Sequence, residues 1–273
     1  MVKYKIVDAH VHVGKFKVSN PKICGWFSAN LENLKDYIKK ENLEAVFLLS
    51  HPPVTGYQLA SSEKVLEIAE KDFRVKPFCM VNILAKNIED EIKKLRKYLS
   101  KGCVGIGEVK AEIPVNHPRM LKLFDWAGEH NLPVIIHMTE KYCYDFFRLR
   151  SLIRKLKTNL IMHGWGWWNH LQNGFIAQIL DEEPNLYMDC SANSGFINLA
   201  KNLNYTKNFL EKYAEKILYG TDFPMLTTYD GTQFGLNKHH LNLLLTLNLN
   251  QKKLRKILRD NALKLLKGGG KRV

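Results

Sequence analysis

The sequence has few cysteines, no leader-like segment and no long apolar run. Its five cysteines include no CxxC pair, and a chain of this size needs no disulfide staples, so a reducing, cytoplasmic setting is expected. Met1 leads directly into a strand-like segment without a signal peptide. No apolar stretch reaches the roughly 18 residues that a membrane span requires. These absences predict a cytoplasmic protein with no membrane association.

Acidic residues are scarce relative to basic ones. Lys and Arg number 41 and Asp and Glu 27, which gives a formal charge of +14. Such an excess suits an anionic partner, such as nucleic acid, an acidic membrane surface or a negatively charged substrate. The basic residues are dispersed through stretches such as 93–101, 154–157 and 252–259. Because they form no single block, the charge is better interpreted as a solvated surface, and nucleic acid is the less favoured partner.

No linker rich in Gly, Pro or Ser divides the chain, and short β-type runs alternate with longer helical stretches. The predicted strands are Tyr4–Val13, Glu44–His51, Lys76–Ile83, Val104–Ala111, Pro133–Met138, Asn159–Gly164, Leu186–Ala192 and Ile217–Pro224. Amphipathic helical spacing is found over Asn87–Tyr98, Arg119–Gly128, Asn208–Lys216 and Leu254–Leu266. Continuous apolar runs such as 45–49 are typical of strands covered on both faces, as in parallel sheets.

Eight strand–helix alternations predict an α/β protein with a (β/α)8 TIM barrel. The barrel is expected to form one domain over residues 1–267, with 268–273 as a flexible tail. An open doubly wound sheet is the rival architecture. No GxGxxG motif follows the first strand, however, and Gly105-Ile106-Gly107 lies within a strand, which argues against a dinucleotide-binding fold.

Six residues of metal-binding type lie at or near the carboxyl ends of five predicted strands. They are His10, His12, Glu108, His137, His163 and Asp222. Side chains alternate along a strand, so His10 and His12 point the same way. The carboxyl ends of barrel strands form one rim, where two carboxylates and four imidazoles would be costly to bury without a counter-ion. The pattern predicts a divalent metal site at this rim, for Zn²⁺, Mn²⁺ or Fe²⁺. The absence of cysteine from the set argues against a structural zinc site.

These motifs closely resemble those of the amidohydrolase superfamily. That family has HxH on strand one, an acid or modified lysine on strand four, His on strands five and six, and Asp on strand eight. The matching segments are Asp8-Ala9-His10-Val11-His12, Gly107-Glu108, Ile136-His137, Met162-His163-Gly164, Gly220-Thr221-Asp222-Phe223-Pro224 and Asn261-Ala262 in the last helix.

Two branches of the superfamily compete. The GTDFP and MHG segments resemble the amidohydrolase-related branch that includes aminocarboxymuconate-semialdehyde decarboxylase. The GIGE segment resembles TatD-type deoxyribonucleases, where the Glu bridges two metals. Here Val109-Lys110-Ala111-Glu112 follows it, in place of the Gly-Leu-Asp-Tyr that is usual in TatD, and this departure weakens the nuclease assignment.

The resemblance implies that His10, His12 and Asp222 hold one divalent metal, while His137 and His163 hold a second ion bridged by Glu108. Zinc is the expected metal, with manganese and iron as alternatives. With one ion, His137 would join the first set and His163 would become a catalytic acid/base or an oxyanion stabiliser. Lys110 is an alternative bridging ligand in carbamylated form.

The implied chemistry is hydrolysis of an amide, ester, lactone or phosphoester by a metal-activated water, with Asp222 as general base. A non-oxidative decarboxylase of an aromatic or enoic carboxylic acid is the closest rival. Such enzymes use one ion and generally lack the strand-four acid, so Glu108 favours hydrolysis. A TatD-like deoxyribonuclease and a non-catalytic binding barrel are further alternatives.

The loops that follow the strands are expected to bind a small-molecule substrate. Trp165 and Trp167, just after His163, and Trp26 from the first loop are candidates for an aromatic wall. His51 and Lys110 are candidates for binding a carboxylate or phosphate. The substrate, the identity and number of the metals, and the choice between monomer and homodimer stay open, because loop residues decide them.

Overall fold

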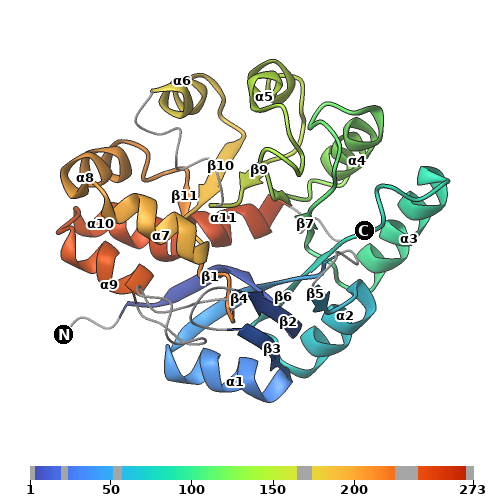
Figure 1. The fold of residues 1–273 in the computed structure, drawn as a ribbon, viewed down its shortest axis with the longest axis horizontal. Coiled ribbons are helices and arrows are strands. Elements are labelled where there is room, and N and C mark those ends of the chain that lie inside the picture. Colours follow the sequence, from blue (N-terminus) through green and yellow to red (C-terminus); the bar gives the residue numbers. More distant parts are fainter. Residues whose placement is uncertain (1–3, 20–23, 52–56, 165–173, 225–238, 269–273) are drawn as a thin grey trace.

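The protein folds as a barrel of eight parallel strands surrounded by helices (Figure 1), in a computed structural model that describes residues 4–19, 24–51, 57–164, 174–224 and 239–268. In sheet order the strands are β1 (Ile6–Val11), β4 (Leu43–Leu49), β6 (Val75–Cys79), β7 (Gly105–Val109), β8 (Val134–Ile136), β9 (Leu160–Met162), β10 (Leu186–Asp189) and β11 (Ile217–Leu218). The predicted (β/α)8 TIM barrel is therefore confirmed.

Backbone hydrogen bonds between β1 and the segment after β11 complete the ring. Ala9 N–H donates to the Tyr219 carbonyl at 2.9 Å, and His12 N–H donates to the Phe223 carbonyl at 2.7 Å. Asp222 N–H in turn donates to the His10 carbonyl at 2.9 Å. The HxH and GTDFP motifs, which lie far apart in the chain, are thereby held side by side.

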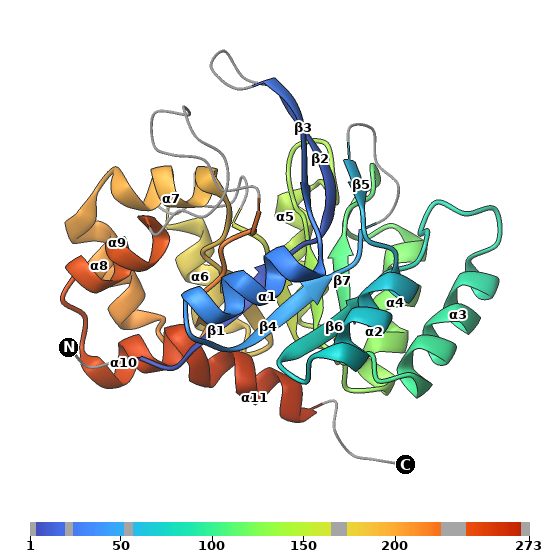
Figure 2. The same ribbon diagram turned by 90° about the horizontal axis from the view of Figure 1, so that it is seen from below.

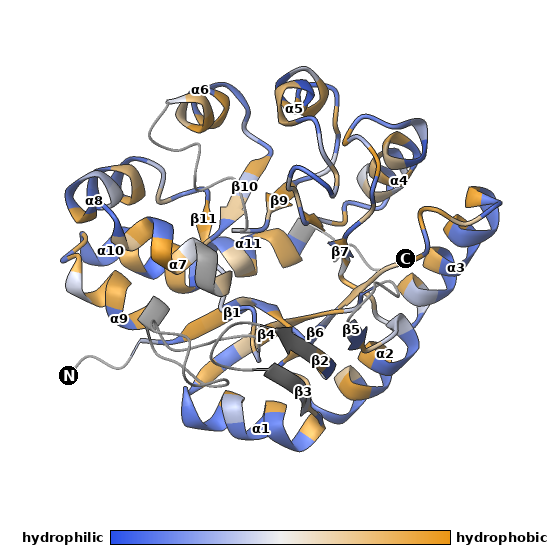
Figure 3. Ribbon diagram, viewed as in Figure 1, coloured by the Kyte–Doolittle hydropathy of each residue, from blue (hydrophilic) through white to orange (hydrophobic). Residues whose placement is uncertain are grey.

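Helices cover the outside of the barrel, with their apolar faces toward the strands (Figure 3). They are α1 (Leu31–Lys40), α2 (Ser62–Lys71), α3 (Ile88–Ser100), α4 (Pro118–Glu129), α5 (Phe146–Ile153), α6 (Phe175–Glu182), α7 (Ala192–Ala200), α8 (Leu203–Lys212), α9 (His239–Thr246), α10 (Gln251–Arg255) and α11 (Asn261–Gly268), with a π-helical turn at Lys256–Asp260. Within the described residues, no helix combines the length and apolar character that crossing a bilayer requires.

The barrel interior is apolar at one end and polar at the other. An inner cluster of buried side chains includes Phe47 from β4 and Phe78 from β6, whose rings stack 4.7 Å apart. Ala262 and Leu265 of α11 belong to the same cluster, so this helix closes the amino-terminal end of the barrel. Figure 2 shows α11 crossing that end. The opposite mouth is left for the polar residues at the carboxyl ends of the strands.

A second, three-stranded antiparallel sheet was not predicted from the sequence. It consists of β2 (Gly14–Ser19), β3 (Cys24–Ala29) and β5 (Tyr57–Leu59), in the order β3-β2-β5. Figure 2 shows these strands projecting from the barrel at the end opposite α11. Gly14 is the bend where the chain leaves β1: its φ is +129°, and a Cβ there would lie 2.5 Å from the Gln58 carbonyl oxygen. The small sheet thus places Tyr57 beside the carboxyl-terminal mouth.

Candidate metal centre

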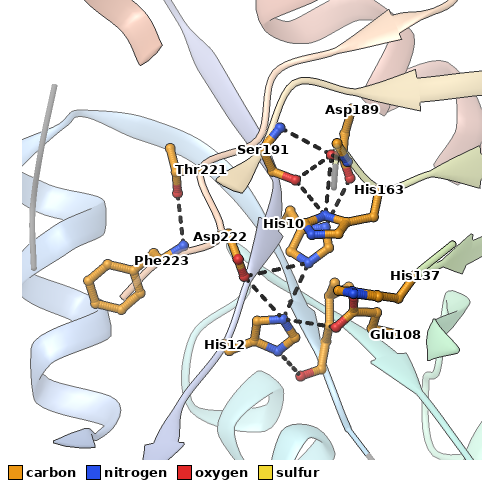
Figure 4. Close-up of polar contacts among 12 residues, drawn as sticks. His10, His12, Glu108, His137, His163, Asp189, Ser191, Thr221, Asp222 and Phe223 are labelled. Atoms are coloured by element: carbon orange, nitrogen blue, oxygen red, sulfur yellow. Dashed lines mark hydrogen bonds and ion pairs between the residues drawn. The ribbon is translucent and has the colours of Figure 1, made fainter. Parts of the chain in front are cut away.

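The six predicted ligands gather at the carboxyl-terminal mouth (Figure 4). His10 Nε2 and His12 Nε2 lie 3.3 Å apart, and Asp222 Oδ1 lies 3.8 Å from the first and 3.5 Å from the second. Glu108 Oε2 lies 3.5 Å from His12 Nε2. The His163 ring stacks near that of His10, with the centroids 4.2 Å apart, and the His137 ring is 5.0 Å from His163.

The other nitrogen of each HxH imidazole already has a partner. His12 Nδ1 lies 3.2 Å from the Leu49 carbonyl oxygen, and His10 Nδ1 lies 2.9 Å from Asp189 Oδ2. Both partners are acceptors, so each Nδ1 must donate a proton. In the neutral rings the two Nε2 atoms are then lone-pair acceptors. They face each other and the carboxylates of Asp222 and Glu108, and a cation bound between these acceptors would stabilise the arrangement.

The spacing of these acceptor atoms fits a divalent ion. Metal bonds of about 2.0–2.2 Å to nitrogen and oxygen place tetrahedral ligands about 3.3–3.6 Å apart. The contacts of 3.3, 3.5, 3.5 and 3.8 Å among His10, His12, Glu108 and Asp222 lie close to that range. Four nitrogen and oxygen donors without sulfur are also the ligand types preferred by Zn²⁺, Mn²⁺ and Fe²⁺.

Glu108 connects the two halves of the cluster. While Oε2 faces His12, Oε1 lies 2.5 Å from Nδ1 of His137. His51 Nε2, 3.6 Å from Oε2, adds a third imidazole to the surroundings of this carboxylate. Each oxygen of Glu108 thus faces a different set of imidazoles, as a carboxylate that bridges two positions does.

Asp222 is held by a buried network on its amino-terminal side. Its backbone lies in the left-handed region, with φ +63°, which an Asp tolerates better than most residues. Thr221 just before it donates from Oγ1 to Asp8 Oδ2 at 2.6 Å, and Tyr37 donates from its hydroxyl to the same oxygen at 2.6 Å. Asp8, the first residue of the DAHVH motif, therefore holds in place the segment after β11 that carries Asp222.

Charge and burial shift the pKa values of the cluster. Burial opposes the charge of His10, but the Asp189 carboxylate outweighs it and raises the pKa of His10 to about 9. Burial would raise the pKa of Glu108, yet His137 and His12 hold it well below its usual range. Burial raises the pKa of Asp222 and lowers that of His137 to about 3. The shifts thus run in opposite directions: the pKa values of His10 and Asp222 rise, and those of Glu108 and His137 fall.

A comparison with protein families decides the assignment. The sequence profile of the Amidohydrolase family matches residues 60–268. The chain belongs to the amidohydrolase family. A search of curated proteins finds no match.

Solved structures resemble this amidohydrolase over almost their whole length. A probable 2-pyrone-4,6-dicarboxylic acid hydrolase from Acinetobacter baumannii, with citric acid bound, has a TM-score of 0.70 at 15% identity and covers 96% of this chain and 99% of its own. A dihydroxybenzoic acid decarboxylase from Polaromonas sp. JS666, with manganese and the inhibitor 2-nitroresorcinol, has a TM-score of 0.65 at 13% identity and covers 97% of each chain. A zinc-bound amidohydrolase from Burkholderia multivorans has a TM-score of 0.65 at 11% identity and covers 96% of this chain and 99% of its own. At these identities the similarity establishes the fold alone.

The predicted substrate-binding residues of the amidohydrolase separate into three groups. His51 lies beside Glu108, and Lys110 lies near the cluster, with its ammonium 4.8 Å from the Tyr142 ring centroid and 5.2 Å from that of Tyr57. Trp26 is 53% exposed on β3, in a cavity of about 410 Å³ that it shares with Lys15, Ser28 and Gln58, none of which is a predicted ligand. Trp165 and Trp167 lie outside the described residues.

Sequence reasoning missed Asp189, Ser191 and Tyr57. Asp189 ends β10 and contacts His10, and Ser191 contacts His163 at 2.7 Å. Asp189 and Ser191 lie at the carboxyl end of the seventh predicted strand, and a position at the carboxyl end of a strand is the same signal that predicts the metal ligands. Burial is the main cause that raises the pKa of Tyr57, and the Asp222 and Glu108 charges add to it, so Tyr57 belongs to the surroundings of the centre. No sequence signal identified it, because it lies on the unpredicted sheet.

Proposed function

We propose that this amidohydrolase is a metal-dependent hydrolase that acts on a small-molecule amide, ester, lactone or phosphoester. The observation that carries the proposal is the surroundings of His12 Nε2: His10 Nε2 lies 3.3 Å from it, and Glu108 Oε2 and Asp222 Oδ1 each lie 3.5 Å from it. Asp222 Oδ1 is also 3.8 Å from His10 Nε2. Catalytic metal sites have this composition, with oxygen and nitrogen ligands at an open barrel mouth.

His10, His12, Glu108 and Asp222 would hold a divalent cation, which would supply a water of lowered pKa and polarise a substrate carbonyl or phosphoryl oxygen. Asp222 directs Oδ1 at the two HxH nitrogens. Its second oxygen is then free to take a proton from the attacking water and deliver it to the leaving group, which is the work of a general base. His163, whose Nδ1 lies against Ser191, has Nε2 available as a second proton carrier or as a ligand.

Glu108 favours hydrolysis over decarboxylation. Glu108 adds a carboxylate on strand four that one-ion decarboxylases generally lack, and it faces both His12 and His137. Decarboxylation of an aromatic or enoic acid is the second candidate, supported by the structural similarity to the Polaromonas decarboxylase.

We further propose that Lys110 binds an anionic group of the substrate. Its ammonium lies between the rings of Tyr57 and Tyr142, which hold a cation by their negative faces without neutralising its charge. His51, buried against Glu108, lies on the same side of the site through its ring contact with Tyr57, with the centroids 6.1 Å apart. A carboxylate or phosphate placed there would leave the scissile bond facing the ligand cluster.

The test is a substrate screen of protein loaded separately with Zn²⁺ and Mn²⁺, together with metal analysis. Hydrolysis of an ester, lactone, amide or phosphoester supports the proposal, and release of CO₂ from an aromatic acid would replace it with decarboxylation. Asp222→Asn is expected to lower kcat by about 10²- to 10⁴-fold, as the loss of a general base does. Full turnover by that variant would remove Asp222 from this role. Cleavage of DNA, with binding that falls steeply as salt rises, would instead support the nuclease alternative.

A further inference from the structure

Asp189 contacts both sides of the ligand cluster. Oδ2 lies 2.9 Å from Nδ1 of His10, while Oδ1 lies 3.6 Å from Nδ1 of His163 and accepts a hydrogen bond from the Ser191 hydroxyl (Figure 4). The Ser191 oxygen is also 2.7 Å from Nδ1 of His163. One carboxylate is therefore in direct contact with His10 and in contact with His163 through a hydroxyl.

The direction of each hydrogen bond follows from what the groups can do. An ionised carboxylate only accepts, so Ser191 must donate its single proton to Asp189. The Ser191 oxygen can then only accept from His163, which places a proton on Nδ1 of that imidazole. His10 likewise carries a proton on Nδ1. In their neutral forms both rings are thus fixed in the tautomer that leaves Nε2 without a proton and available to a cation or an incoming proton.

The fold holds this arrangement rigidly. Asp189 and Ser191 are both fully buried. The backbone N–H groups of Gly164 and Ser191 donate to Asp189 Oδ1 at 3.0 and 3.1 Å, which fixes the carboxylate. Gly220 permits a close approach to β1 and to the segment after β10, because a Cβ there would lie 3.1 Å from the Cβ atoms of both His10 and Ser191.

We propose that Asp189 and Ser191 are a positioning pair that sets the tautomers of His10 and His163 together, so that one buried carboxylate serves both a metal ligand and a proton carrier. Groups that hydrogen-bond the outer nitrogen of a ligating histidine typically change metal affinity 10- to 100-fold when they are replaced. The inference rests on the proposed metal centre for His10, whereas the tautomer of His163 can be measured with or without metal.

The first experiment is long-range ¹H–¹⁵N NMR of ¹⁵N-histidine-labelled protein, zinc-loaded and zinc-free, with the two signals assigned from single His→Gln variants. In the zinc-loaded protein, both His10 and His163 are expected to carry the proton on Nδ1. Ser191→Ala should change the His163 signals alone, and Asp189→Asn should change both. His163 protonated on Nε2 in the unchanged protein would overturn the proposal.

The second experiment is zinc competition against a chelator for the tightest-bound ion. Asp189→Asn is expected to weaken zinc binding 10- to 100-fold, whereas Ser191→Ala should leave it close to that of the unchanged protein. Thr158→Val is the matched control, since it removes a buried hydroxyl that donates to the Leu132 carbonyl. Thr158 precedes β9 and lies at the other end of the barrel.

Equal zinc affinity in Asp189→Asn and Thr158→Val would refute the positioning role of Asp189 while leaving the proposed function intact. A protein that binds no zinc, manganese or iron would refute the proposed function. The His163 signals of the zinc-free protein would then still decide whether Ser191 sets its tautomer.

Discussion

Glu108 lies among three imidazoles of the centre. Its two oxygens face His12 and His51 on one side and His137 on the other. Glu108→Gln keeps the shape of the side chain but removes its charge and turns one acceptor into a donor. We expect zinc affinity to fall at least tenfold, measured by chelator competition. Glu112→Gln, at an exposed glutamate paired with Lys141, is the control and should bind zinc normally. Unchanged affinity in Glu108→Gln would exclude Glu108 as a ligand.

Lys110 and Lys141 form a natural pair for testing anion binding. Both ammonium groups contact the Tyr142 ring, at 4.8 and 5.3 Å, but Lys141 is exposed and paired with Glu112. Lys110→Met is expected to weaken the binding of benzoate or inorganic phosphate to the metal-loaded protein about 10-fold or more, as the loss of a charged hydrogen bond does. Lys141→Met should have little effect. Equal losses in the two variants, measured by calorimetry, would argue against Lys110 as the anion-binding group.

The ligand residues could be predicted because they combine an unusual residue type with a position that the barrel makes meaningful. His137 and His163 each follow an apolar strand directly, so their convergence followed from the fold alone. Asp189 followed the same rule but was overlooked, because the family pattern assigns it no role. The partners of Lys110 were beyond prediction, since Tyr57 and Tyr142 come from segments whose paths depend on tertiary contacts.

At the scale of elements, α11 closes the amino-terminal end of the barrel. Asn261 is buried and donates from its amide to the carbonyls of Ala214 and Ile217, at 2.7 and 2.8 Å. Asn261→Ala leaves both carbonyls without this donor, and an unsatisfied buried group costs about 1–3 kcal/mol. We expect a loss of about 2–4 kcal/mol in the free energy of unfolding, measured by urea denaturation. Lys264→Ala, on the exposed side of the same helix, should stay within about 0.5 kcal/mol of the unchanged protein.

The eight barrel strands were predicted in number and order, and their ends less well. The predicted eighth strand, Ile217–Pro224, is regular only over Ile217–Leu218, and Asp222 in its second half has a left-handed backbone. The apolar and aromatic residues after β11 have the sequence pattern of a strand but lie at the carboxyl-terminal mouth of the barrel. The small sheet was missed because Lys15-Phe16-Lys17-Val18 alternates too briefly to distinguish an antiparallel strand from a loop.

At the scale of the whole molecule, an ion pair joins the early and late parts of the chain. Arg259 donates from Nε and Nη2 to Glu44 at 2.6 and 2.8 Å. The hydrogen bond from Arg259 lowers the pKa of Glu44. A depressed carboxyl pKa contributes stability above the unfolded value of about 4.3, and this contribution is lost as the pH falls through the folded pKa.

Glu44→Gln should therefore lower the melting temperature at pH 7 by about 2 °C, for a pair worth about 1 kcal/mol. The difference from the unchanged protein should shrink between pH 5 and pH 3. Glu32→Gln, at an exposed glutamate paired with Lys35, is the control. A difference that stays constant with pH would show that packing, and not charge, accounts for the loss.

Metal should stabilise the whole barrel, because its ligands come from strands at both ends of the sheet. A ligand that binds only the folded state adds about 2.7 kcal/mol at 100 times its Kd. Zinc at that excess is expected to raise the melting temperature by several degrees, and a chelator should reverse the rise. An unchanged melting temperature would contradict binding to the folded state.

The joining of β1 to the segment around Asp222 also sets an order of events in the making of the protein. His10 and His12 are translated about 210 residues before Asp222, which at 5–20 residues per second is about 10–40 s. Until the ribosome releases that last segment, the two imidazoles lack both the aspartate and the neighbouring strand that hold them. The ion is therefore expected to bind at the end of biosynthesis, after the segment around Asp222 has paired with β1.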